Sequence, residues 1–195
     1  RLPTTMYLGI ISSVFSVAIG VLFGTLTAVK RGTWIDNIIT VVSNIGLATP
    51  VFWFGILLVF IFSLTLDILP SNGFVFPWED LGLSIQQTIM PVVCMSIGGV
   101  ASYTRQTRSS MLEVIRQDYI RTARSKGLPE GRIIWKHALK NAMIPILTLI
   151  AVTLRNTIAG AAIIVNVINI NGMGNLVVQC ITKREFQLVQ ACILL

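Results

Sequence analysis

The residue types that could carry out chemistry are sparse in this chain. Of its 195 residues 12% are charged, and it has one histidine and three cysteines. The sequence contains no phosphate-binding G-x-x-x-x-G-K-[ST] loop, no H-E-x-x-H zinc motif and no G-x-G-x-x-G after a strand-like run. A lone histidine among Lys and Leu, His137, is typical of a helix surface or an interface. We therefore expect no catalytic residue, metal site or cofactor in this chain, and no enzymatic activity of its own.

The charged residues that do occur are concentrated in one stretch. Between Arg105 and Lys140 there are nine basic residues against three acidic ones, Glu113, Asp118 and Glu130. The nine are Arg105, Arg108, Arg116, Arg121, Arg124, Lys126, Arg132, Lys136 and Lys140. Clustering of this kind, within a net charge of +7, is unlike an extended nucleic-acid-binding face, and we expect no nucleic acid partner. A polar segment between apolar ones favours the docking of a protein partner.

Two short helices around a Gly-Leu-Pro hinge would present these charges. The first is predicted from about Asp118 to Lys126, because an acid near its start and basic residues near its end suit the helix dipole. Gly127 lies where a C-terminal cap needs a left-handed residue. Pro129 lies where a first helical turn tolerates proline. The second helix carries three basic residues on a polar side: Arg132, Lys136 and Lys140.

The run YIRTARSKGL, from Tyr119 to Leu128, followed by HALKNAMIP up to Pro145, resembles the cytoplasmic "EAA" loop of bacterial ABC importer permeases. The pair Ala123-Arg124, where the generic motif has Ala-Ala, is similar to the dipeptide/oligopeptide/nickel branch of that family. The resemblance extends over nearly the whole chain, through RLPTTMYL, LATPVFWFGILL, LPSNG and NGMGNLVVQCITKREFQLVQ. It implies an all-α, type I-like polytopic transmembrane bundle.

In that family the loop forms a coupling helix that fits a groove in the ATPase subunit. The resemblance therefore implies a single permease domain over residues 1–195, with a cytoplasmic coupling loop at about residues 113–141, called the basic loop below. The positions that match the motif form the expected ATPase-coupling set: Tyr119, Thr122, Ala123, Arg124, Lys126, Gly127, Leu128, His137, Ala138, Leu139, Asn141 and Pro145.

The resemblance also implies a cargo and a set of partners. The cargo would be di- or oligopeptides, or nickel or another metal chelate. The partners would be a homologous second permease, two ATP-binding subunits, an extracytoplasmic substrate-binding protein and membrane lipid, in the bacterial inner membrane. Closure of the ATPases on ATP would move the docked loop and open a central cavity outward.

Several positions depart from the family pattern. Relatives usually carry an acidic residue, an aromatic residue and Pro-Gly where this chain has Val165, Ile168 and Asn171-Gly172. They generally have a small or neutral residue in place of Arg155. These departures lie toward the outer half of the expected pathway, so they leave the basic loop intact and the identity of the cargo open.

Composition predicts a membrane protein without reference to the family. The chain is 54% hydrophobic, and a helix needs about 20 mainly apolar residues to cross a bilayer. Four such segments are predicted, with a fifth begun at Phe186 and cut short: about 6–29, 38–66, 88–103 and 142–167. With Arg as its first residue, and a last apolar run that stops at Leu195, we expect the chain to be a fragment of a longer permease with about five spans.

The charges of the connecting segments predict the orientation. The connection from Asp67 to Gln87 holds three acidic residues and no Lys or Arg, whereas Lys30-Arg31 and the basic loop are positive. Because basic loops stay cytoplasmic, the acidic connection and the segment 169–184 are expected outside. A short helix around Trp78 to Ser84 is predicted in the acidic connection.

Three features within the spans leave alternatives open. Gly20 and Gly24 form a G-x-x-x-G pair that could admit a close helix neighbour or arise by chance. Pro50 interrupts the second span, and Trp53 follows it, either for packing or for lining a gated passage. Arg155 either snorkels or pairs structurally, or faces the central pathway and meets an acidic group on the cargo. Pro50, Trp53 and Arg155 are the candidate pathway residues.

Two other classes of protein compete with the permease hypothesis. A stand-alone secondary transporter or channel would need intramembrane ionisable groups and internal repeats, but the spans hold one arginine and no clear repeat. A membrane anchor whose basic loop binds anionic lipid would not need the Gly-Leu-Pro hinge. Both hypotheses therefore rank below the permease.

Overall fold

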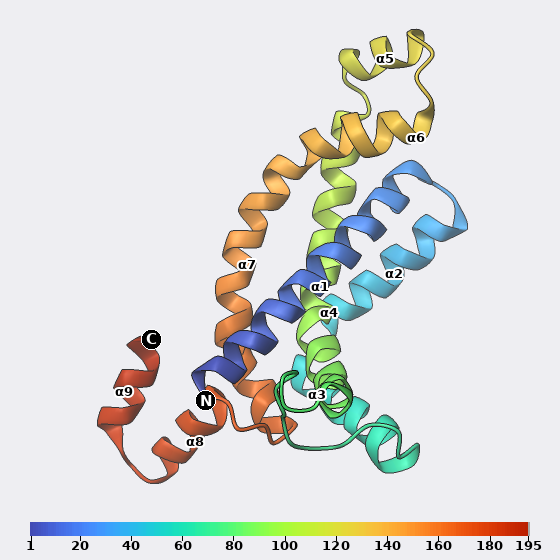
Figure 1. The fold of residues 1–195 in the computed structure, drawn as a ribbon. Helices are drawn as coiled ribbons and strands as arrows, with labels where there is room; N and C mark the ends of the chain where they lie inside the picture. Colours follow the sequence, from blue (N-terminus) through green and yellow to red (C-terminus); the bar gives the residue numbers. More distant parts are fainter. Residues whose placement is uncertain (195) are drawn as a thin grey trace. The chain divides into compact units, whose positions relative to one another are not determined.

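The computed structural model describes the backbone of residues 1–194 and the side chains of residues 1–153 and 164–191. Within that part every regular element is a helix (Figure 1). The elements are α1 Leu2–Val29, α2 Trp34–Ala48, α3 Val51–Leu58, the π-helical η1 Val59–Thr65, α4 Leu81–Val114, α5 Asp118–Ser125, α6 Glu130–Arg132, the π-helical η2 Ile133–Ala138, α7 Leu139–Val167, α8 Met173–Thr182 and α9 Phe186–Leu194.

The apolar helices confirm the expected class of polytopic helical membrane protein. In the described part, three helical stretches are long and apolar enough to cross a membrane: Leu2–Val29, Leu81–Val114 and Glu130–Thr153. A fourth is obtained if α2 is counted together with α3 and η1 as one span. The last predicted span corresponds to α9, which has nine residues in the described part.

The second predicted span is two helices rather than one kinked helix. Pro50 has extended backbone angles (φ −62°, ψ 128°) and is the N-cap of α3. Its carbonyl accepts a hydrogen bond from the Phe54 N–H at 3.1 Å. The helix is interrupted here because proline lacks an N–H donor and disfavours helical geometry at the preceding residue, Thr49.

The helix of the third span begins earlier than predicted and takes up the end of the expected short helix. α4 runs without a break from Leu81 to Val114, with Pro91 inside it. The segment predicted to be helical from Trp78 is a turn up to Asp80, whose carboxylate accepts a hydrogen bond from the Leu83 N–H at 3.0 Å. The helix begins at this point because the Asp80 side chain caps its first turn.

The described part divides into two compact units, each built from distant segments. Unit 1 comprises Arg1–Val14, Thr49–Ile97 and Leu154–Leu195, and unit 2 comprises Phe15–Ala48 and Gly98–Thr153. The expectation that residues 1–195 form one domain stays a prediction.

Unit 1 is built around an apolar cluster and an aromatic group. The cluster includes Leu8, Met90 and the buried Cys94. The aromatic group joins α1 to the acidic connection: Tyr7 packs edge-on against Phe74 at a centroid distance of 5.6 Å. Cys94 is fully buried and is a small apolar residue of this core.

Unit 2 is held together by a close approach of α1 and α4. A Cβ atom built on Gly20 would lie 2.5 Å from the Tyr103 Cβ, and one built on Gly24 would lie 2.5 Å from the Thr107 Cβ. Real Cβ atoms do not approach so closely, so these positions require glycine. Of the two alternatives for the G-x-x-x-G pair, the structure supports the close helix neighbour.

A buried ion pair also ties α2 to α4 within unit 2. Arg108 donates from Nε to Oδ1 of Asp36 at 3.0 Å and from Nη2 to Oδ2 at 2.8 Å. Asp36 is only 4% exposed, and it also accepts a hydrogen bond from the Gly32 N–H at 3.0 Å. The bidentate geometry fixes the start of α2 against α4.

Replacing Asp36 by alanine should therefore destabilise the permease. Removing one partner of a buried pair leaves a charge without compensation. Because the Arg108 side chain is 32% exposed, we expect about 2 kcal/mol, or about 4–8 °C in melting temperature, rather than the full cost of a fully buried pair. The measurement is thermal unfolding in detergent. The double variant Asp36→Ala/Arg108→Ala should be no less stable than the single one, and a strictly additive loss would contradict this account.

Candidate functional site

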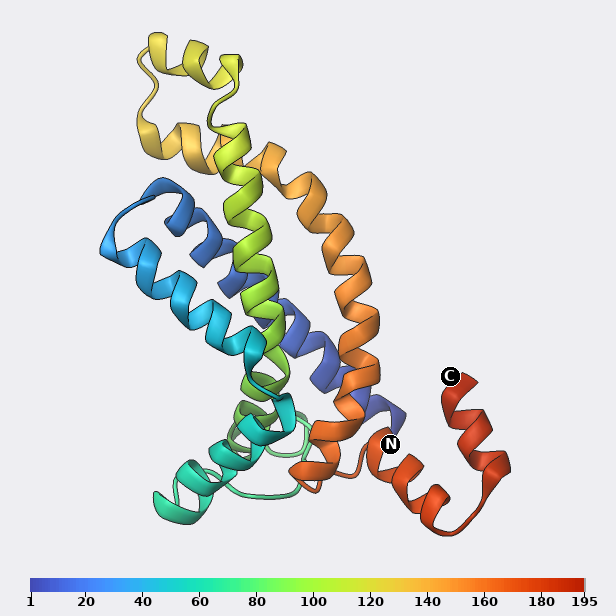
Figure 2. The ribbon, with the colours of Figure 1, turned by 180° about the vertical axis from the view of Figure 1, so that it is seen from behind.

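The first helix of the basic loop is the short α5, most of whose residues are exposed. Asp118 lies in its first turn and Arg124 in its last, as the helix dipole favours. Ile120 is fully buried and joins Ile133, Ala138 and Met111 in the apolar cluster of unit 2. Figures 1 and 2 show α5 alongside α6 and η2. The predicted helix at Asp118 is confirmed, ending at Ser125 with Lys126 as its C-cap.

Gly127 ends α5 in the conformation expected from the sequence. Its φ is +74°, in the left-handed region that favours glycine. The Gly127 N–H donates to the Arg124 carbonyl at 2.9 Å, and the Leu128 N–H donates to the Ala123 carbonyl at 3.4 Å. This pair of bonds is a Schellman motif, which satisfies the last carbonyls of the helix. Ala123 and Leu128 then pack against the apolar cluster of unit 2.

An ion pair closes the turn after Gly127. Arg124 donates from Nε to Oε1 of Glu130 at 2.7 Å and from Nη2 to Oε2 at 3.4 Å. Pro129, with φ −65° and ψ 139°, is the N-cap of α6 rather than its first helical residue. Its extended ψ directs the chain back from α5 into α6.

The second helix of the basic loop is not a separate short helix. α6, η2 and α7 follow one another without a break from Glu130 onward. No glycine or proline lies between Arg132 and Asn141 to end the helix, and Pro145 is accommodated inside α7. The segment from Glu130 onward therefore continues directly into the apolar helix α7. At the other end of the basic loop, a short turn joins α4 to α5.

A hydrogen bond across the basic loop holds α5 to the start of α7. Asn141 donates from Nδ2 to the Tyr119 hydroxyl at 2.8 Å and to the His137 carbonyl at 3.2 Å. Tyr119 is 43% exposed. The contact thus joins the two ends of the basic loop at its surface.

We predict that Tyr119→Phe loosens the basic loop without unfolding the permease. Loss of one exposed hydrogen bond costs about 1 kcal/mol at most, so opening should become about three- to fivefold more frequent. Limited trypsin digestion at the exposed Arg121, Arg124 and Lys126 should accelerate by that factor. Tyr7→Phe, the same change outside the basic loop, should leave the rate unchanged. Equal rates in the two variants would show that the bond does not hold the loop.

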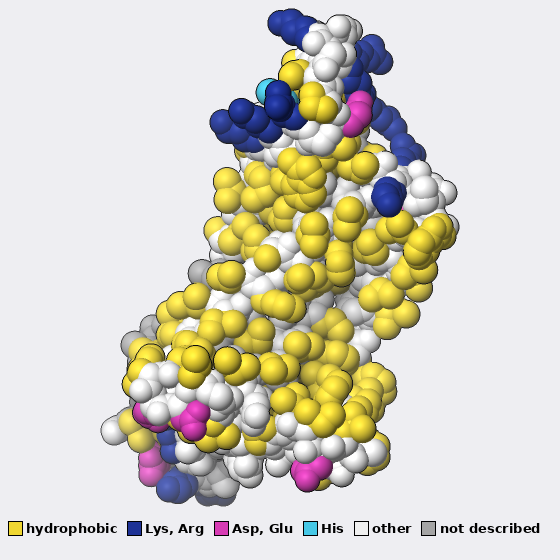
Figure 3. Space-filling view, turned by 45° about the vertical axis from the view of Figure 1, so that its right-hand side comes forward, with side chains coloured by type: hydrophobic (Ala, Val, Ile, Leu, Met, Phe, Trp, Pro, Cys, Tyr) yellow, Lys and Arg dark blue, Asp and Glu magenta, His cyan; other side chains and the backbone are white. Residues whose placement is uncertain are grey.

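The expected coupling residues divide into an inner and an outer set. Ala138 is fully buried, and Ala123, Leu128, His137 and Leu139 are half-buried. The outer set is exposed: Tyr119, Thr122, Arg124, Lys126, Gly127, Asn141 and Pro145. Figure 3 shows Lys and Arg side chains gathered over the α5 to η2 segment. The structure therefore forms an exposed basic surface supported by an apolar cluster.

Comparison with known proteins identifies the family. Residues 20–195 match the family described as "Binding-protein-dependent transport system inner membrane component". The chain belongs to this family.

The family's curated members include several that are similar over the whole chain. The oligopeptide transport system permease protein AppB of Bacillus subtilis is 36% identical over 98% of this chain and 61% of its own length. A probable peptide ABC transporter permease protein, y4tP, of Sinorhizobium fredii is 36% identical over the full chain and 62% of its own length. The di/tripeptide transport system permease protein DppB of Pseudomonas aeruginosa is 35% identical over 99% of this chain. The chain thus spans about three fifths of the length of these family members.

A solved structure agrees with this fold. A chain from the inward-facing MetNI methionine ABC transporter superposes with a TM-score of 0.69, at 20% identity, over 90% of this chain and 76% of that one. At this level of identity the similarity establishes the fold of the family.

Two of the three candidate pathway residues of this family member have described side chains. Pro50 and Trp53 lie at the start of α3 in unit 1, and Trp53 is half exposed. The Arg155 side chain lies outside the described residues. No group of three or more His, Cys, Asp or Glu side chains that could hold a metal ion occurs among the residues with described side chains.

Sequence reasoning missed two contacts that shape this family member. The Asp36–Arg108 pair joins residues 72 positions apart, and no local pattern links them. The Arg124–Glu130 pair lies within the basic loop. In the sequence the two residues are opposite charges on either side of the Gly-Leu-Pro hinge. They meet only because Gly127 turns the chain back.

Proposed function

We propose that this chain is the permease part of an ABC importer, and that its basic loop docks an ATP-binding subunit. The observation that carries the proposal is the geometry of that loop. An exposed basic surface is held rigidly by a Schellman cap, the Arg124–Glu130 pair and the Tyr119–Asn141 bond. It is continuous with the apolar helix α7 and follows closely on α4. A push on α5 would therefore be transmitted to both helices.

The proposed cargo is a peptide. Curated relatives at 35–36% identity are named as oligopeptide and di/tripeptide transport permeases. The departures at Val165, Ile168 and Asn171-Gly172 leave the length of the peptide open, and nickel or another metal chelate is the alternative cargo. If Arg155 faces the pathway, its guanidinium would meet the carboxyl terminus of the peptide.

The proposed assembly contains this permease, a homologous second permease, two ATP-binding subunits and an extracytoplasmic substrate-binding protein, in the bacterial inner membrane. ATP hydrolysis then takes place on the ATP-binding subunits. Closure of these subunits on ATP would displace α5 and reorient the apolar helices, so that the cavity between the two permeases opens outward.

Purification of the complete permease from its native membrane tests the proposal. An ATP-binding protein should remain bound in mild detergent and be identified by mass spectrometry. The ATP hydrolysis of the complex should rise when peptide-loaded binding protein is added. A permease that transports peptide in proteoliposomes without any ATP-binding protein would overturn the proposal in favour of a stand-alone transporter.

The orientation gives an independent prediction. In a variant without native cysteines, a cysteine at the exposed Gln179 should react with an impermeant thiol reagent in intact cells. A cysteine at the exposed Ser125 should react only after the membrane is permeabilised. Permeabilisation should leave the rate at the Gln179 cysteine about the same and raise the rate at the Ser125 cysteine by about tenfold or more. The reverse pattern would place the basic loop on the wrong side to meet an ATPase.

A further inference from the structure

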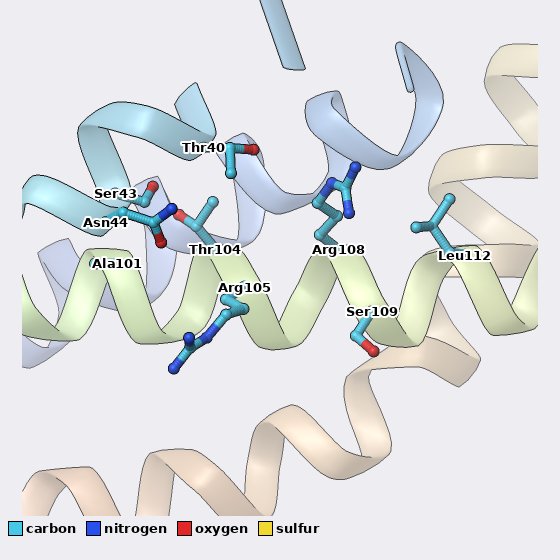
Figure 4. Close-up of a pocket in the computed structure, with 9 residues that line it drawn as sticks. All are labelled: Thr40, Ser43, Asn44, Ala101, Thr104, Arg105, Arg108, Ser109 and Leu112. Atoms are coloured by element: carbon cyan, nitrogen blue, oxygen red, sulfur yellow. The ribbon is translucent and has the colours of Figure 1, made fainter. Parts of the chain in front are cut away.

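One face of α4 is polar from Gly98 onward. Its five residues, called the polar face of α4 below, follow one another at helical spacing and so lie on one side of the helix: Gly98, Ser102, Arg105, Ser109 and Glu113. The first two are half-buried and the last three are exposed. A Cβ built on Gly98 meets nothing within 4 Å, so the space in front of that residue is open. Figure 4 shows Arg105 and Ser109 directed away from α2.

The contacts between α1 and α4 set the depth of this polar face. Three contacts share one register, in which a residue of α4 lies beside the residue of α1 that precedes it by 83 positions. The three pairs are Ser16–Gly99, Gly20–Tyr103 and Gly24–Thr107. In this register Arg105 lies level with Leu22, eight residues before Lys30, which follows the apolar run of α1. Arg105 is therefore about 12 Å deeper in the membrane than Lys30.

Two arginines near this depth have different surroundings. Arg108, on the side of α2, is neutralised by its bidentate ion pair with the buried Asp36. Arg105, one turn earlier, is exposed and forms no ion pair with any carboxylate in the part of the chain with described side chains. A charged side chain at membrane depth faces either a partner or water, because lipid tails cannot compensate the charge. The contrast indicates water on the side of α4 that carries Arg105.

The surface of α1 at the same depth is apolar. Leu22, level with Arg105, is 39% exposed, and the sequence of α1 from Leu2 to Val29 contains no charged residue. Such a surface suits contact with lipid tails. The polar face of α4 does not, since none of its five residues has an apolar side chain that lipid could cover. Unit 2 therefore presents an apolar surface and a polar surface at one depth.

We propose that the polar face of α4 lines the cytoplasmic half of the water-filled path of the cargo, and that Arg105 pairs transiently with a carboxylate of the passing peptide. The planar guanidinium presents N–H donors in an arrangement that matches a carboxylate. The hydroxyls of Ser102 and Ser109, one turn to either side, hydrogen-bond to water or to the peptide backbone. The inference rests on the proposed function for its cargo and for the orientation of α4.

Cysteine labelling tests whether this face is in contact with water. The complete permease without native cysteines, in its complex and without ATP, carries either Ser102→Cys or Leu22→Cys, and a charged thiol reagent is added to inside-out vesicles. Ser102 lies deeper than Leu22 in the register, so distance from the cytoplasm alone favours reaction at Leu22. Ser102→Cys should nevertheless react at least about tenfold faster, because only a hydrated thiol ionises to the reactive thiolate. Equal rates, or a faster reaction at Leu22, would overturn the proposal.

Uptake of a labelled tripeptide tests the role of Arg105. Arg105→Gln should lower the maximal uptake rate at least about tenfold and leave unchanged the peptide concentration that gives half of that rate, since the binding protein captures the peptide first. Arg105→Lys keeps the charge and should retain at least about half of the rate. Arg31→Gln removes an exposed charge from the α1–α2 turn and is the matched control, with uptake unchanged. Equal losses in Arg105→Gln and Arg31→Gln would reduce the effect to general surface charge.

The stimulation of ATP hydrolysis by peptide-loaded binding protein separates this inference from the proposed function. Arg105→Gln should keep the stimulation, because the basic loop is unchanged. Normal uptake in this variant would overturn the role of Arg105 and leave the proposed function standing. A lack of stimulation in the unchanged permease would contradict the proposed function itself. Dissociation of the Arg105→Gln complex in size-exclusion chromatography would show that Arg105 pairs with a neighbouring subunit, and would overturn its role in the path.

Discussion

Gly24→Ala is expected to lower the melting temperature of the purified permease by about 5–10 °C, equivalent to an overpacking cost of about 2–3 kcal/mol. The added Cβ would lie 2.5 Å from the Thr107 Cβ and 2.6 Å from the Thr104 carbonyl oxygen. A backbone oxygen cannot rotate away as a side chain can, so α1 and α4 must separate. The measurement is thermal unfolding in detergent followed by size-exclusion chromatography.

Gly98→Ala is the matched control for this effect. Gly98 lies in α4, the helix that Gly24 of α1 approaches, but a Cβ built there meets nothing within 4 Å. Helix propensity alone favours alanine at both positions by about 1 kcal/mol. Gly98→Ala should therefore leave the melting temperature unchanged or raise it. If Gly24→Ala were as stable as Gly98→Ala, the two helices would not be in close approach at Gly24.

Gly127→Val is expected to reduce transport by at least tenfold while the permease still inserts into the membrane. At φ +74° a β-branched residue is strained by at least about 1–2 kcal/mol. The strain would undo the Schellman cap and release Leu128 from the apolar cluster, so the surface formed by α5 would lose its fixed position. Uptake of labelled peptide into cells and the stimulation of ATP hydrolysis by loaded binding protein are the two measurements.

Gly131→Val isolates the effect of backbone conformation. Like Gly127, Gly131 is exposed and has nothing within 4 Å of a built Cβ, but its φ is not positive. Steric space alone predicts the same outcome for both variants, whereas backbone strain predicts a loss at Gly127 only. Normal uptake in Gly127→Val would remove the hinge from the coupling mechanism, and a loss in both variants would point to contact with a partner instead.

The basic loop could be predicted from the sequence where its signals are local. Asp118, Gly127 and Pro129 each act within a few residues, so the first helix and its left-handed cap were correctly placed. Pro129 was predicted in the first turn of the second helix but is the N-cap of α6, so its predicted position was wrong by one residue. The coupling roles of these residues stay predictions, because the described chain contains no partner.

The second half of the basic loop shows why the rest could not be predicted. Its buried residues are Ile133, Ala138 and Ala142, which are spaced by five and then four positions. A regular α-helix does not place residues five apart on one face. The π-helical turn η2, from Ile133 to Ala138, takes up the extra residue. A prediction from the sequence that assumes a regular α-helix therefore fails to identify Ala138 as a core residue.

The contact between α1 and α4 also sets a condition on how the chain is made. Thr107 follows Gly24 by 83 residues, which at about 5–20 residues per second takes roughly 4–17 s to synthesise. During that time the polar face of α1 has no α4 to pack against. Two hydroxyls of this face, those of Thr25 and Thr27, already have acceptors, because they donate to carbonyls of their own helix at 2.8 and 2.9 Å. The nascent α1 helix can thus reside in lipid until the ribosome has synthesised α4, which packs against it.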